Sequence, residues 1–132
     1  MQCEEAMKKV AIFCLVGMGI GAIGWPGATM SVSMSIVTVT AYHPGAYCPG
    51  VPRGITASGI KVQEGMVAVS RDVERNLNLD FGDRVLLHGL GVFEFQDRMA
   101  SRCKKKVDVY IDCTKKARRF GVKRYVVLVK LV

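Results

Sequence analysis

The chain has 132 residues and a formal net charge of +8 at pH 7, with 19 Lys and Arg residues against 11 Asp and Glu residues. This length suits one domain and leaves no room for a second hydrophobic core. Two histidines without any CxxC pair match no common zinc spacing, so we expect neither a metal nor a cofactor. The basic surplus favours acidic partners, and the candidates are nucleic acid, anionic lipid headgroups and acidic cell-wall polymers. A surface charge that only keeps the protein soluble is the simplest alternative.

Residues 1–33 have the features of an export signal. Met7, Lys8 and Lys9 form a short basic start, and residues 10–25 form an uncharged apolar run. The length of this run suits a signal-peptide core or a short membrane anchor better than a buried helix. A cleaved signal and an uncleaved anchor both stay open, and contact with the membrane is expected only through an uncleaved segment. We therefore expect residues 34–132 to fold as one domain in the periplasm or cell envelope, where nucleic acid is not a partner.

The folded part begins with a strand pattern. Residues 36–42 (IVTVTAY) alternate β-branched and aromatic residues with others, as a strand does. Residues 43–54 collect three prolines and form a loop that either lines a cleft or is a surface connection. The small polar residues Thr56, Ser58 and Gly59 form a turn that would let a ligand approach the backbone closely, unless it is an ordinary turn.

Short strands separated by turns follow. Residues 66–69 (MVAV) predict a strand, and Ser70 is expected to cap a short helix directly after it. Residues 84–88 and 91–96 predict two strands close enough to form a hairpin. Residues 107–111 (VDVYI) predict a further strand whose alternation places its aspartate on the opposite face from its valines.

The C-terminal part combines a helix with a last strand. Thr114 is expected to cap a short helix that Gly121 ends, with several cations in its last turn. Residues 125–131 (YVVLVKL) are nearly continuous in apolar residues, which predicts that the final strand is a central one. The total is six strands and two short helices. A closed β-barrel satisfies this pattern best, because closure removes exposed edges.

Three cysteines follow the leader, namely Cys48, Cys103 and Cys113. In an oxidising compartment two of them could pair and one would be left over. Cys103 and Cys113 flank the predicted strand at residues 107–111, and the sequence leaves a bridge between them open.

Seven short motifs follow one another along the chain, namely VTVTAY (37–42), TASG (56–59), GMVAV (65–69), FGDRV (81–85), FQD (95–97), VDVY (107–110) and ARRFGV (117–122). Their order and spacing are more specific than any one of them. Together they resemble the 3D domain, a family named for three aspartates. This domain is found at the C-terminal end of MltA-type lytic transglycosylases and in stationary-phase survival proteins. The resemblance implies an all-β fold, a six-stranded double-psi β-barrel with one or two short helices.

The resemblance also implies a set of site residues. The catalytic acid and base would be Asp108, with Asp97 as a second aspartate. Asp72 would replace the family's first aspartate, whose usual place directly after VAV holds Ser70, and residues 97–102 replace a glycine-rich segment. The implied substrate-binding residues are Tyr42, Thr56, Ser58, Gly59, Asp72, Arg98, Arg102 and Tyr110.

A lytic transglycosylase cleaves the bond from MurNAc to GlcNAc without water, because the C6 hydroxyl of MurNAc attacks its own anomeric carbon and gives a 1,6-anhydro end. One carboxyl group can then serve first as acid and later as base. Asp97 nearby would favour the acid form of Asp108, whereas Arg98, Arg102 and residues 104–106 would oppose it if they point into the cleft. The competing hypothesis is a non-catalytic module that binds peptidoglycan or another polysaccharide. A third is a structural envelope protein whose acids only accept backbone hydrogen bonds.

Overall fold

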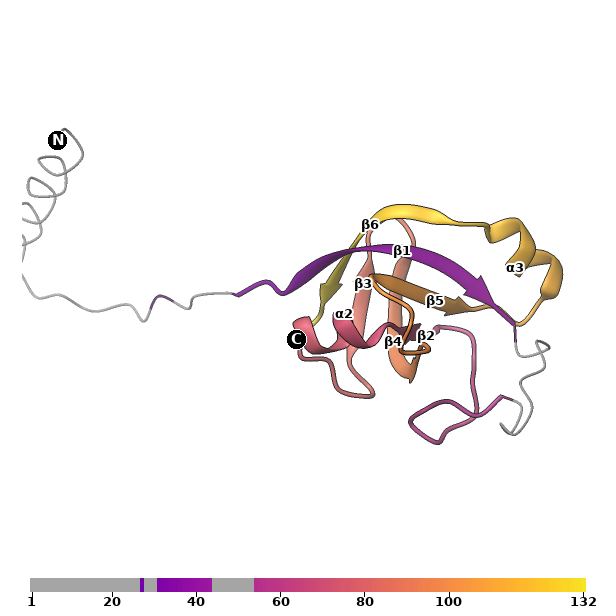
Figure 1. Ribbon diagram of the computed structural model, residues 1–132, viewed down its shortest axis with the longest axis horizontal. Coiled ribbons are helices and arrows are strands. Elements are labelled where there is room, and N and C mark those ends of the chain that lie inside the picture. Colours follow the sequence, from indigo (N-terminus) through magenta and orange to yellow (C-terminus); the bar gives the residue numbers. More distant parts are fainter. Residues whose placement is uncertain (1–26, 28–30, 44–53) are drawn as a thin grey trace, which may run out of the picture. The chain divides into compact units, whose positions relative to one another are not determined.

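The computed structural model describes residues 27, 31–43 and 54–132 (Figure 1). The strands in this part of the chain are β1 (Met34–Tyr42), β2 (Met66–Val69), β3 (Arg84–Leu87), β4 (Gly91–Arg98), β5 (Lys106–Tyr110) and β6 (Lys123–Lys130). The helices are α2 (Arg71–Asn76) and α3 (Thr114–Phe120). The strands close into one barrel in the order β1-β5-β2-β4-β3-β6. The predicted all-β, six-stranded barrel with two short helices is confirmed.

Two of the sequence-based predictions fall on other parts of the chain. The expected export segment at residues 1–33 lies outside the described residues except for residues 27 and 31–33, and most of the expected loop at 43–54, with Cys48, lies outside them too. In the described ranges, no helix has the length and apolar character needed to span a membrane.

The order of the strands has an internal two-fold symmetry. Exchanging β1, β2 and β3 with β4, β5 and β6 reproduces the same order around the barrel. The parallel pairs β1–β5 and β2–β4 exchange with each other, while the antiparallel pairs β2–β5 and β3–β6 each map onto themselves. The seam between β2 and β5 and the seam between β3 and β6 therefore lie on opposite sides of the closed ring.

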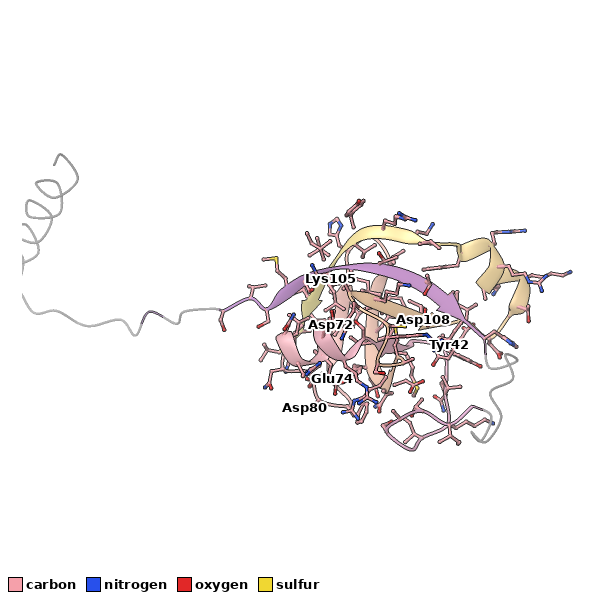
Figure 2. The ribbon with its side chains drawn as sticks, in the orientation of Figure 1. Tyr42, Asp72, Glu74, Asp80, Lys105 and Asp108 are labelled. Atoms are coloured by element: carbon pink, nitrogen blue, oxygen red, sulfur yellow. The ribbon has the colours of Figure 1, made fainter. Side chains whose placement is uncertain are left out.

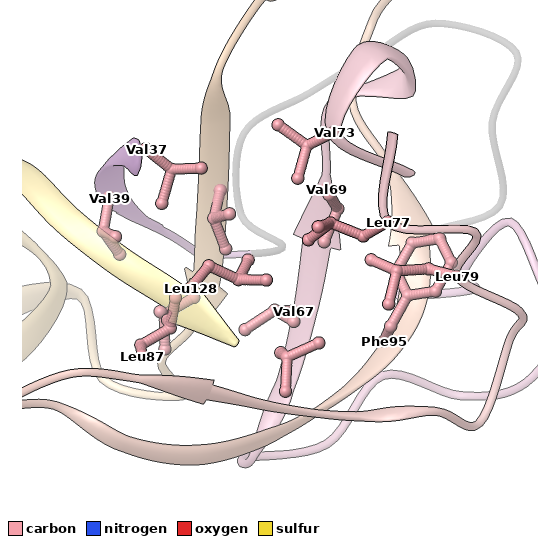
Figure 3. Packing of buried hydrophobic residues seen from close by; sticks show 13 residues of the cluster. Val37, Val39, Val67, Val69, Val73, Leu77, Leu79, Leu87, Phe95 and Leu128 are labelled. Carbon is pink, nitrogen blue, oxygen red and sulfur yellow. The ribbon is translucent and has the colours of Figure 1, made fainter. Parts of the chain in front are cut away.

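Branched aliphatic residues fill the interior of the barrel (Figure 3). On β5, Val107 and Val109 are buried in this core, and Asp108 between them is only partly buried on the outer face, as the alternation predicted. Each buried aliphatic side chain of this size contributes about 1.5–3 kcal/mol. The core thus fixes the strands on which the outward polar residues stand.

The helix α2 begins after Ser70 as predicted, whereas α3 begins one residue earlier than predicted. Ser70 occupies the N-cap position of α2, but its side chain makes no capping hydrogen bond. Its Oγ instead accepts the backbone N–H of Lys106 at 3.1 Å, which ties β5 to the end of β2. At α3 the N-cap residue is Cys113, and Thr114 is the first helical residue. Gly121 ends α3 as predicted, with a φ of 67° that glycine adopts without a Cβ clash.

The prediction that the last strand is central is confirmed for its pairing, because β6 lies between β3 and β1, but the outer face of β6 is not fully covered. Leu128 is fully buried, but Tyr125 is 83% exposed. The physical reason is the closed barrel, because each strand turns one face to the core and the other outward. A register shift against β1 also places Tyr125 in a bulge with a φ of 58°.

Candidate functional site

Asp97 and Asp108 lie in one row of paired residues that crosses four strands. Ala68 on β2 is the partner of both Asp97 on β4 and Asp108 on β5, and Asp108 is also the partner of Thr40 on β1. Residues opposite each other in a sheet point to the same face, so both carboxyl groups stand on the outer face, one on each side of Ala68. Two strand spacings put their Cα atoms about 10 Å apart. In this row, the side chain between the two carboxyl groups is only the methyl group of Ala68.

A cavity of about 270 Å³ lies over this row of residues. It is bounded by both acids and by the loop that follows β4. Its lining residues are Tyr42, Ala68, Asp97, Arg98, Met99, Ala100, Arg102, Cys103 and Asp108. The structure therefore brings Asp97, Asp108, Tyr42, Arg98 and Arg102 of the predicted site residues together.

Asp97 is held in place by three hydrogen-bond donors. Its Oδ1 accepts the backbone N–H of Ala57 at 2.9 Å and that of Arg98 at 2.8 Å. Its Oδ2 accepts the hydroxyl of Tyr42 at 3.4 Å. Burial raises the pKa of Tyr42 far above its usual value, and the carboxyl groups of Asp97 and Asp108 raise it further, so this phenol keeps the proton that it donates. Both oxygens of Asp97 are thus committed to contacts within the protein.

Asp108 has fewer hydrogen-bond partners than Asp97. The hydroxyl of Thr40 donates a hydrogen bond to its Oδ1. In the part of the chain that the structure describes, no other group donates to this carboxyl, and its Oδ2 accepts no hydrogen bond there. Asp108 and Tyr42 lie at the same end of the barrel (Figure 2), where both line the cavity.

The small polar turn at residues 56–59 contacts Asp97 and its strand but does not line the cavity. Thr56 Oγ1 and Ser58 Oγ are 2.8 Å apart, and the backbone N–H of Ser58 donates to the carbonyl of Gln96 at 3.1 Å. These contacts tie the turn to β4 directly beside Asp97. Gly59 completes the turn with a φ of 88°. Thr56, Ser58 and Gly59 were expected to contact substrate, and the structure places them where they position Asp97.

Asp72 also lies outside the cavity lining. Its Oδ2 accepts the backbone N–H of Lys105 at 3.0 Å, at the start of β5 (Figure 2). Burial alone would raise the pKa of Asp72, but hydrogen bonds from Ser70 and Lys105 outweigh it and hold the pKa below its usual value. With the contact from Ser70 to Lys106, this bond fixes the start of the strand that carries Asp108.

Arg98 turns its charge away from the two carboxyl groups. Its guanidinium forms an ion pair with Glu74, with Nη2 at 2.6 Å from Oε1, and it lies 4.3 Å from the centre of the Phe81 ring. The hydrogen bonds to Glu74 raise the pKa of Arg98. Arg102, by contrast, is exposed at the cavity and makes no ion pair within the described residues. Of the two predicted arginines, Arg102 is therefore the one available to an anionic group of a ligand.

Tyr110 lies beside Tyr42, its partner in the β1–β5 pairing, and does not line the cavity. Its ring meets that of Tyr42 edge to face, with the ring centres 5.6 Å apart. Its hydroxyl donates to Oδ1 of Asp112 at 3.3 Å. Burial raises the pKa of Tyr110, and the carboxyl of Asp112 raises it further.

Cys103 lines the cavity, whereas Cys113 does not. Cys103 and Cys113 are both free thiols, so the bridge between them does not form. Within residues 27, 31–43 and 54–132, no group of three or more His, Cys, Asp or Glu side chains is placed to hold a metal ion.

Thr40 and Ala68 are site residues that the sequence analysis did not identify. A signal for Thr40 was present, because strand alternation places it on the same face as Tyr42, two residues later. Ala68 gave no such signal. Its role depends on pairing with two acids that are far from it in sequence.

In comparisons with known proteins, no protein-family model matches the chain, and no curated protein matches it either.

Proposed function

We propose that this protein acts on peptidoglycan glycan strands as a lytic transglycosylase of the cell envelope, with Asp108 as the acid and base. The main support is the row in which Asp97 and Asp108 flank Ala68 over one cavity. Three motifs that resemble the 3D domain fall on this row, since VAV carries Ala68, FQD carries Asp97 and VDVY carries Asp108. The two-fold strand order with two parallel pairs also suits a double-psi barrel.

In the proposed reaction Asp108 works through its free oxygen. The protonated carboxyl first gives its proton to the glycosidic oxygen that leaves from C1 of MurNAc. The resulting carboxylate then takes the proton of the C6 hydroxyl as this oxygen attacks C1. The glycosidic bond breaks, the C6 oxygen bonds to C1, and the proton count balances without water. Thr40 holds the other oxygen of Asp108 during both steps.

Asp97 has a different part in this proposal. Its two oxygens are held by Ala57, Arg98 and Tyr42, so it keeps one orientation across the methyl of Ala68. A fixed negative charge at that place stabilises positive charge that develops at the anomeric carbon. Asp97 thus stabilises the positive charge at the anomeric carbon, while Asp108 transfers the proton.

A second candidate is a module that binds glycan without cutting it. The cavity volume of about 270 Å³ is just below the range of roughly 300–1,000 Å³ that is usual for ligand sites. A cavity of this size favours recognition of a short stretch of sugar over enclosure of a long strand.

Purified sacculi incubated with the full chain separate these two functions. The proposed reaction predicts soluble muropeptides with 1,6-anhydro ends in mass spectrometry, released in proportion to the protein added. Release of reducing ends would show hydrolysis and contradict the proposed chemistry. Retention of the protein on sacculi without any release would favour the binding module.

A further inference from the structure

A band of apolar side chains covers the outer face of the barrel at the seam between β3 and β6. Strand pairing sets Val92, Leu86, Val129 and Met34 side by side in one row across β4, β3, β6 and β1. The ends of this row are open to solvent, with Val92 52% and Met34 61% exposed. In the next row Ile36, 59% exposed, is the partner of Val127. We call these residues the apolar band: Met34, Ile36, Leu86, Val92, Val127 and Val129.

The apolar band is the reason that β6 looked like a central strand in the sequence. The outward residues Val127 and Val129 of β6 are apolar, as in a strand covered on both faces, yet the described chain buries them only in part and leaves Met34, Ile36 and Val92 of the band exposed. Contiguous apolar surface of this kind on a soluble protein marks a docking site more often than chance. The band lies on the side of the ring opposite the seam between β2 and β5, which carries Asp108.

Tyr125 projects at the edge of this band. A bulge puts Arg124 and Tyr125 opposite the single residue Thr38 of β1, and Tyr125 has a φ of 58°. This left-handed conformation is disfavoured for a residue with a Cβ. Bulges commonly re-aim a side chain, and here the ring is 83% exposed. The fold therefore holds a large aromatic ring in water at a local conformational cost.

Cations adjoin Tyr125 without any neutralising acid in the same stretch. Six exposed basic residues occur between residues 115 and 124, and none forms an ion pair with a described residue. They are Lys115, Lys116, Arg118, Arg119, Lys123 and Arg124. Lys130, at the end of β6, does form an ion pair, with its Nζ 2.9 Å from Oδ2 of Asp83. The helix α3, which carries four of the six, has no buried residue.

We propose that this surface docks the barrel on an anionic membrane. The apolar band and Tyr125 would enter the headgroup region, and the cations of α3 and β6 would contact lipid phosphates. An apolar face bordered by Lys and Arg, with an amphipathic ring between them, is the composition that binds to anionic bilayers from one side. A second copy of the chain is a poorer occupant, because a two-fold contact over the band would bring the cations of both copies together. The docked barrel turns its Asp108 cavity away from the bilayer.

Flotation of the full chain with lipid vesicles tests this docking. We expect binding to phosphatidylcholine vesicles that contain phosphatidylglycerol, weaker binding to phosphatidylcholine alone, and release by salt. The double variant Lys123→Glu/Arg124→Glu should lower the affinity for the mixed vesicles about tenfold or more, since each basic residue near an anionic surface contributes to binding. The matched control Lys61→Glu/Lys104→Glu has the same net charge, and it should bind as the wild type does.

Tyr125→Asn tests the apolar part of the surface without a change of charge. Asparagine tolerates the left-handed conformation, so this variant should fold, and its vesicle binding should fall severalfold. Equal binding by wild type, the Lys123→Glu/Arg124→Glu variant and Tyr125→Asn would overturn the proposal and assign any binding to another segment. If these variants bind vesicles as the wild type does but lose binding to sacculi, the surface binds a wall polymer and the proposal is overturned. If they bind vesicles normally but lose self-association in sedimentation, the surface binds a second copy and the proposal is likewise overturned.

Discussion

Thr40 donates a hydrogen bond to Asp108 from the directly opposite position of the parallel β1–β5 pair. Thr40→Val keeps the shape of the side chain and removes the donor. Because the cavity admits water to Asp108, we expect a stability loss of only about 1 kcal/mol. Misorientation of the acid should lower the rate of anhydro-muropeptide release by about ten- to a hundredfold. Urea unfolding and sacculus digestion measure the two effects, and Thr40→Ser should restore most of the rate. Full activity in Thr40→Val would show that Asp108 needs no orienting group.

Ala68 keeps the space between Asp97 and Asp108 open. Ala68→Leu would extend a side chain from the floor of the cavity, and we expect it to abolish glycan binding and release. Ala68→Ser, which adds one atom, is the matched control and should keep most of the binding. Co-sedimentation with sacculi gives the readout, and circular dichroism checks the fold. Normal glycan binding by a folded Ala68→Leu protein would place the ligand elsewhere.

Asp72 makes the fold sensitive to acid. Its folded-state pKa is held below the usual value of 3.8, so its carboxylate contributes stability that is fully present above about that pH. This contribution is lost as the pH falls through the lower, folded-state pKa. Asp72→Ala should therefore cost about 1–2 kcal/mol at pH 7, and the gap to wild type should shrink in strong acid. Urea unfolding of both proteins from pH 7 to strong acid measures this difference in unfolding free energy. A gap that stays constant with pH would mean that the lost contact is not ionic.

The sequence predicted the barrel because its signals are local. Alternation in residues 107–111 was enough to put Asp108 outside and its valine neighbours inside. The bounds of β2 were read correctly from MVAV between two turns. Closure followed from counting short strands with no long helix to cover them. Each of these steps needs only neighbours along the chain.

The parts that the sequence could not supply depend on distant pairs. The meeting of Ala68 with both acids follows from a strand order that brings β4, β2 and β5 together. Arg98 was left between two orientations, and its pairing with Glu74 requires α2 to pack beside the end of β4. Ser70 is a residue type that often caps helices, yet its hydroxyl oxygen accepts a hydrogen bond from the backbone N–H of Lys106, which is distant in sequence. Tertiary contacts decided each of these cases over local preference.

Asp108→Asn tests the central claim most directly. An amide keeps the size and one acceptor of the carboxyl but cannot give or take the proton. General acid and base catalysis is worth roughly a hundred- to ten-thousandfold in rate. We therefore expect release of 1,6-anhydro ends from sacculi to fall by about that factor, with the melting temperature little changed. Asp97→Asn should be milder, and the exposed Asp80→Asn is the control that should match wild type. Equal rates of release by wild type and Asp108→Asn would contradict the assignment of Asp108 as the catalyst.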